Sequence, residues 1–102
     1  MNTKNSVSPE ILGKVANLAD LVAYSPGAVV SKTLLDTPAG TITLFSFDVG
    51  QGLSEHEAPF DAFVEVLDGQ AKIHIAREAL TVFTGQVVIM PASMPHAISA
   101  EV

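Results

Sequence analysis

Short apolar runs, separated by turn residues at intervals of about ten residues, are the feature that most limits what this chain can fold into. The clearest run is 41–48, where Ile42 and Leu44 alternate with Phe45 and Phe47 across the two faces of a strand. Similar runs predict strands over 28–36, 62–67, 70–75, 80–83, 87–90 and 96–100. About seven short strands with turns between them predict an all-β sandwich or barrel, jelly rolls included.

The chain before residue 27 has a different pattern. Ser8 followed by Pro9 is typical of a helix start, but Gly13 limits the length of that helix. A second short turn fits 17–22, where apolar residues fall on one face. A length of 102 residues corresponds to one domain. We divide it into an N-terminal segment with short helical turns, 1–26, and a β-barrel, 27–102.

The charge of the chain argues against two classes of partner. The net charge is −6 at pH 7 and the five basic residues are scattered, whereas nucleic acids and anionic membranes attract clustered basic residues. We therefore expect no nucleic-acid partner and no membrane partner. The chain has no cysteine, no apolar run of the roughly 20 residues that span a bilayer, and no start typical of a signal peptide. We expect a cytoplasmic protein.

Two of the predicted strands are apolar on both faces. In 62–67, Val64 and Val66 lie on one face while Phe63 and Leu67 lie on the other, and in 87–90 every residue is apolar. A strand in a two-layer fold needs only one apolar face, so a second apolar face indicates that something covers it. We expect a homodimer, and the alternative is coverage by the N-terminal segment.

Two of the three histidines lie in segments with a characteristic spacing. The residues that carry it are Gly50, His56 and Gly69 in the first segment, and Gly85, Pro91 and His96 in the second. These segments resemble the two sequence motifs of the cupin superfamily. The resemblance implies a double-stranded β-helix with a pocket between its two sheets. Cupins typically hold a divalent transition metal there with three histidines and one glutamate.

The metal-ligand set implied by the resemblance is incomplete in this chain. Its second histidine falls on Ala58 and its glutamate on Ala62, so only His56 and His96 remain. A first-row metal usually takes three or four protein ligands. Asp61 would complete a set of two histidines and one carboxylate. It lies one residue from the expected position, which turns its side chain to the other strand face unless a bulge restores it.

Three functions follow from these residues. We expect a small organic ligand to bind in the barrel pocket, whose lining we assign to His56, His96, Val64, Val66 and Met90. The first alternative is a metal-dependent enzyme of isomerase, decarboxylase or dioxygenase type that uses His56, His96 and Asp61. The second is a structural or regulatory dimeric partner protein. His74, on a polar strand face, is expected at the surface.

Overall fold

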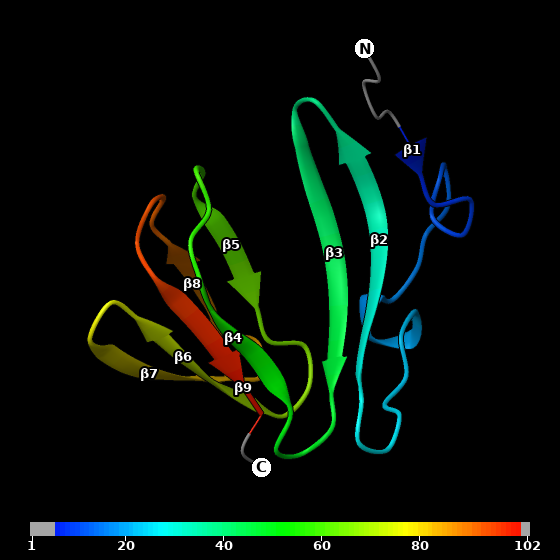
Figure 1. Cartoon of the computed structure of the whole chain (residues 1–102). Helices are drawn as coiled ribbons and strands as arrows, with labels where there is room; N and C mark the ends of the chain where they lie inside the picture. The colour runs from blue at the N-terminus through cyan, green and yellow to red at the C-terminus, as the bar shows by residue number, and fades with distance from the viewer. Residues whose placement is uncertain (1–5, 101–102) are drawn as a thin grey trace.

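The computed structural model describes residues 6–100, and over this range nearly all of the regular secondary structure is β-strand (Figure 1). Its strands are β1 (Ser6–Val7), β2 (Val29–Thr37), β3 (Gly40–Phe47), β4 (Gly52–His56), β5 (Ala62–Glu65), β6 (Gln70–Ile75), β7 (Glu78–Phe83), β8 (Val87–Met90) and β9 (His96–Ser99). The helical structure in this range is one 3-10 turn, η1 (Leu18–Asp20), and no described helix could cross a membrane. The predicted all-β fold class is confirmed.

The strands form three antiparallel sheets, with the orders β1-β2-β3, β4-β9-β6-β7 and β5-β8. Their pairings are nested: the β6–β7 hairpin lies inside the β5–β8 pair, which lies inside the β4–β9 pair. Nested antiparallel pairing rolls a chain onto itself and brings distant segments together, as in jelly rolls. This topology places the end of β4 beside the start of β9, although 40 residues separate them.

The N-terminal segment contains one short helical turn, η1, within the stretch 17–22 where the sequence predicts one. The helix start predicted at Ser8 is a single hydrogen-bonded turn, in which the N–H groups of Ile11 and Leu12 both donate to the Ser8 carbonyl. Gly13 then adopts a φ of 68°, a left-handed conformation that ends a helical turn. Residues 1–5 of the predicted N-terminal segment and 101–102 of the predicted barrel lie outside the described residues.

The main core lies between the four-stranded sheet and the β5–β8 pair. Ile73 on β6 is fully buried at its centre, surrounded by Val66, Val82 and Met90. Half-buried apolar residues complete the cluster, namely Ala62, Val64, Ala71, Ile75, Val88 and Ile98. The alternation of these residues along their strands is the pattern that the sequence shows, because one face of each strand points to the core.

The N-terminal segment packs on the β2–β3 hairpin, partly through polar contacts. Lys32 on β2 forms an ion pair with Glu10, and its Nζ donates to the Leu21 carbonyl at 3.2 Å. On β3, the Ser46 hydroxyl donates to the Ala23 carbonyl at 2.8 Å. The described part of the N-terminal segment therefore covers one face of this hairpin.

The outer faces of β5 and β8 form an exposed apolar surface. Phe63 is 66% exposed and Ile89 is 59% exposed, while their neighbours Val64 and Met90 face the core. Residues 6–26 of the N-terminal segment do not cover this surface, so the side chains of Phe63 and Ile89 stay exposed. The predicted homodimer stays a prediction, and this surface is the face that it would bury.

Candidate functional site

Two histidines from strands far apart in the sequence meet in this structure. His56 ends β4, His96 begins β9, and the two residues are paired directly across the antiparallel ladder. Their Nε2 atoms lie 3.0 Å apart, and their rings meet edge to face with centroids 4.3 Å apart. The two histidines predicted for the site therefore form one pair.

The backbone of β4 explains how the two rings reach each other. At Gly52 a Cβ atom would collide with the carbonyl oxygen of Ile98, so glycine lets β4 lie this close to β9. The register then shifts between Leu53 and His56. Such an irregularity changes the direction of a side chain relative to a regular ladder. It brings His56 opposite His96 at the end of the ladder.

A backbone carbonyl holds the Nδ1 atom of each ring. Nδ1 of His56 lies 2.8 Å from the Ser54 oxygen, and Nδ1 of His96 lies 3.2 Å from the Met94 oxygen. Because a carbonyl oxygen can only accept, both Nδ1 atoms carry a hydrogen and donate it. Two neutral rings would then face each other with bare Nε2 lone pairs, which repel. One added proton makes an N–H···N hydrogen bond and gives the pair a positive charge.

The histidine pair connects the buried interior with the surface. His96 is only 3% exposed, whereas His56 is exposed. A buried positive charge is costly unless polar groups or an anion surround it. With one shared proton the pair is therefore suited to attract an anionic group, through its charge, at the exposed ring of His56.

The other residues predicted to line the pocket lie in the core. Val66 and Met90 are buried against Ile73, and Val64 packs against the same cluster. Their inward direction agrees with the sequence pattern, but they fill the interior instead of bordering either of the depressions described next. His74 is exposed on β6, as expected for a residue of the polar face.

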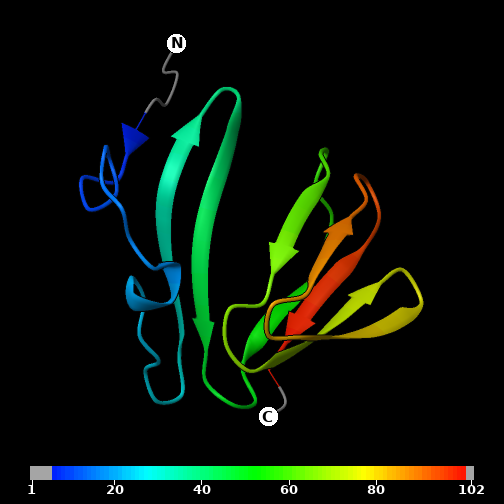
Figure 2. The same cartoon turned by 180° about the vertical axis from the view of Figure 1, so that it is seen from behind.

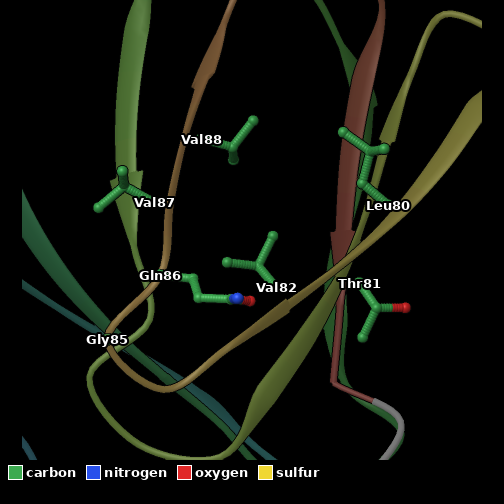
Figure 3. Close-up of a pocket in the computed structure, with 7 residues that line it drawn as sticks. All are labelled: Leu80, Thr81, Val82, Gly85, Gln86, Val87 and Val88. Carbon is green, nitrogen blue, oxygen red and sulfur yellow. The ribbon is translucent and has the colours of Figure 1, made fainter.

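Two depressions lie along β7 and β8, and the second also reaches the end of β6 and the loop before β9. The first has a volume of about 490 Å³, and Figure 3 shows Val82 and Val88 pointing into it while Thr81 points away. The second has a volume of about 590 Å³. Its lining is mostly apolar and includes Ile75, Leu80, Val88, Ile89 and Met94, with Arg77 and Glu78 beside them.

Two residues that line the second depression are neighbours of His96, although neither histidine lines it. Ile75 lines it and is paired directly with His96 in the β6–β9 ladder, and directly opposed residues share one face of a sheet. Met94 also lines it and supplies the carbonyl that holds His96. The alternation of Ile73 and Ile75 was the available signal for Ile75.

No protein-family model matches the sequence, and no curated protein matches it. Among solved structures, a conserved protein of unknown function from Streptococcus pyogenes is 36% identical, covering 99% of this chain and 85% of that one, with a TM-score of 0.82. A cupin 2 conserved barrel domain protein from Leptotrichia buccalis is 42% identical over 84% of this chain, with a TM-score of 0.82, and this chain spans 41% of its length. A cupin superfamily protein from Desulfitobacterium hafniense is 29% identical, covers 99% and 89% of the two chains, and has a TM-score of 0.83.

The chain belongs to the cupin superfamily. This confirms the resemblance of its two motifs and the predicted double-stranded β-helix. It establishes no specific activity, since the Streptococcus protein is itself described as one of unknown function.

The donor set of this cupin does not fit the metal that the superfamily typically binds. The carboxylate of Asp61 binds elsewhere, since its Oδ1 accepts a hydrogen bond from the Ala92 N–H at 2.8 Å. Among residues 6–100, no three histidine, aspartate or glutamate side chains are grouped so that they could hold a metal ion. The structure brings His56 and His96 together but does not bring Asp61 to them. Two imidazoles fall short of the three or four protein ligands that a first-row metal usually takes.

Ser93, which precedes His96, has a left-handed backbone although it is not glycine. The glycine of the second motif, three residues before the last histidine, is Ser93 in this chain, and its φ is 62°. Glycine adopts such a left-handed conformation freely, whereas serine does so rarely. The Ser93 N–H donates to the Ala58 carbonyl at 2.7 Å, which holds the turn beside the histidine pair.

Proposed function

We propose that this cupin binds a small organic acid, with the carboxylate at the His56–His96 pair and an apolar body in the neighbouring depression. The observation that carries the proposal is the geometry of the pair: both Nδ1 hydrogens are held by carbonyls, and the two Nε2 atoms lie 3.0 Å apart. A proton shared between the two Nε2 atoms would join the rings by a hydrogen bond and give the pair a positive charge, which attracts an anion.

The apolar part of the proposed site supports an apolar ligand body. The second depression has a volume of about 590 Å³, which lies within the usual range for small-molecule sites. Adjacent strands are about 4.8 Å apart. A ligand in the depression beside Ile75 therefore has His96 one strand away and His56 two strands away. A chain of several carbon atoms spans this distance.

The metal-dependent enzyme is less well supported by these residues, because the donor set stops at two imidazoles. A structural or regulatory partner role would explain the exposed apolar surface of β5 and β8 but would not explain the histidine pair. Ligand binding uses both features of the site, the polar pair and the apolar depression.

Thermal unfolding with hexanoate and with hexanamide tests the proposal, because the two probes share an apolar body and differ in charge. A ligand that binds the native state raises the melting temperature in proportion to RT ln(1 + [L]/Kd). We expect hexanoate to raise it more than hexanamide in the wild-type protein. His56→Ala should abolish this difference, and the matched control His74→Ala, on the exposed face of β6, should retain it.

Two outcomes contradict the proposal. Equal shifts with hexanoate and hexanamide would remove the role of the positive pair. A shift with zinc or nickel chloride that disappears in His56→Ala, without a hexanoate effect, would assign the pair to a metal and restore the enzyme alternative.

A further inference from the structure

The two depressions along β7 and β8 are parts of one groove, because Leu80 on β7 and Val88 on β8 line both of them. The two strands follow each other in the chain but belong to different sheets. They diverge from the turn 84–86, as Figures 2 and 3 show. The groove therefore runs along both strands and away from this turn.

The turn 84–86 closes one end of the groove, where Gly85 and Gln86 line the first depression. The Gln86 N–H donates to the Phe83 carbonyl at 2.9 Å, and the Phe83 N–H donates back to Oε1 of Gln86 at 2.9 Å. The Gly85 N–H donates to the Val66 carbonyl at 2.7 Å, which connects the turn to the chain after β5. These hydrogen bonds hold the turn in place and make this end of the groove a blind end.

The other end of the groove leads toward His96. Ile75 and Met94 line the second depression there, and both are neighbours of His96. Arg77 and Glu78 line the same depression. The charged residues of the groove are therefore on the side where the proposed carboxylate binds.

The lining becomes apolar toward the blind end. No charged residue of the described chain lines the first depression. Val82 is buried and Val88 is half-buried, and both point into this depression, whereas Thr81 points away (Figure 3). The amide oxygen of Gln86 already accepts a hydrogen bond from the Phe83 N–H. A groove with this polarity fits a ligand that has one polar head and an apolar tail.

The length of the groove limits the length of that tail. The lining along β8 runs from Val87 to Pro91, which extended backbone spans in about 13 Å. An extended polypeptide advances about 1.2 Å per covalent bond, and an alkyl chain has similar geometry, so about ten carbon atoms fill this length.

We propose that the groove holds the tail of an unbranched fatty acid, with the carboxylate at the histidine pair and the methyl end at the turn 84–86. This inference rests on the proposed function and narrows its ligand to acids with an alkyl chain of about ten carbon atoms. A short acid such as hexanoate fills only the second depression. A longer chain passes Leu80 and Val88 and also fills the first depression.

Isothermal titration calorimetry with hexanoate, decanoate and tetradecanoate, each below its micelle concentration, tests this site. Because a fully buried methylene strengthens binding by about fourfold and an open groove buries only part of each, decanoate should bind at least about tenfold more tightly than hexanoate. Tetradecanoate is longer than the groove. It should bind within about twofold of decanoate, because its additional carbons stay in water.

Two substitutions of neighbouring residues show whether the tail occupies the first depression. Val82→Phe places a ring in this depression and should remove most of the advantage of decanoate, while hexanoate binds as in the wild type. Thr81→Phe is the matched control, because Thr81 points away from the depression, and it should keep the full advantage. Val82→Leu, a smaller change, should reduce the advantage in part and serves as the test if Val82→Phe does not fold.

Three results overturn the proposal. Equal affinities for hexanoate and decanoate in the wild type would remove the tail site and leave the proposed function intact. An unchanged advantage of decanoate in folded Val82→Phe and in Val82→Leu would place the tail elsewhere. Decanoate binding that weakens as the protein concentration rises would show that a second copy of the chain covers the groove.

His56→Ala separates this inference from the function on which it rests. We expect it to weaken hexanoate and decanoate by the same factor, because it removes the site of the carboxylate and leaves the groove unchanged. An advantage of decanoate that is lost in Val82→Phe, in a protein whose affinity for both acids is unaffected by His56→Ala, would support the tail site and contradict the proposed function.

Discussion

Ile73 on β6 and Ile42 on β3 are the same residue in strands of similar length, yet Ile73 is 0% exposed and Ile42 is 52% exposed. The difference reflects how two regions of the molecule are stabilised. The barrel region encloses a cluster of apolar side chains between two sheets. The β1–β3 region buries Leu34 and Leu44 but leaves much of its surface exposed, and polar contacts with the N-terminal segment hold it. The barrel is therefore sensitive to side-chain volume, and the β1–β3 region to its polar contacts with the N-terminal segment.

The largest expected effect tests this comparison directly. Ile73→Ala removes a fully buried side chain and should lower the free energy of unfolding by about 2–5 kcal/mol, because it loses burial and leaves a cavity. Ile42→Ala is the matched control in the other region and should cost less than about 1 kcal/mol. Denaturant unfolding followed by circular dichroism measures both. Equal losses would show that Ile42 is packed as tightly as Ile73 in solution and would end the contrast between the two regions.

The sequence predicted the barrel because its core strands alternate with period two. Ile73, Val82 and Met90 all lie in runs that were assigned as strands, and all three are buried. The strand β4 was missed, because the run from Gly52 to His56 contains little apolar alternation. Its place in the sheet is decided by long-range pairing with β9, which local pattern does not encode.

The candidate site was predictable in part. The spacing of the two motifs identified His56 and His96, but their direct contact depends on the β4–β9 register and its shift after Leu53. Asp61 is a second residue whose role the sequence alone does not determine. Its distance along the chain allowed a third ligand, whereas the fold directs its carboxylate to the Ala92 N–H. The hydrogen-bond partners of a polar side chain are set by tertiary structure, and a single sequence does not specify them.

A glycine in each region gives the second prediction. Gly52→Ala introduces a methyl group against the Ile98 carbonyl, so β4 must shift away from β9 at a cost of about 1–3 kcal/mol. Gly40→Ala, in the β2–β3 hairpin, meets nothing within 4 Å and should change stability by about 0.5 kcal/mol or less. Unfolding by denaturant measures the stability of both variants.

Histidine NMR signals show whether Gly52→Ala also disturbs the site. A shift of β4 should separate the two Nε2 atoms and change the imidazole signals of His56 and His96, while those of His74 stay as in the wild type. Unchanged signals for the pair, together with full stability, would show that the barrel accommodates the methyl group. The close approach of β4 and β9 would then not depend on glycine.

The smallest expected effect concerns the hydrogen bond between Tyr24 and Asp68, which connects the N-terminal segment to the turn after β5. The hydrogen bond to Asp68, then burial and the charge of Asp68, raise the pKa of Tyr24 above its ordinary value of 10.0. A raised pKa means that the folded protein holds this proton more tightly than the unfolded chain does. The contribution to stability is therefore complete below about pH 10 and is lost as the pH rises through the higher pKa of the folded protein.

Tyr24→Phe removes this hydrogen bond and the titration together. We expect the wild type to be slightly more stable than Tyr24→Phe at pH 7 and 9, and the two stabilities to converge above pH 10. The lysines titrate equally in both proteins, and Tyr24 is the only tyrosine, so its ultraviolet absorbance reports its ionisation directly. A Tyr24 titration at the ordinary value, with a stability difference that does not depend on pH, would show that the contact with Asp68 does not persist in solution. The hydrogen bond would then contribute nothing to the link between the N-terminal segment and the turn after β5.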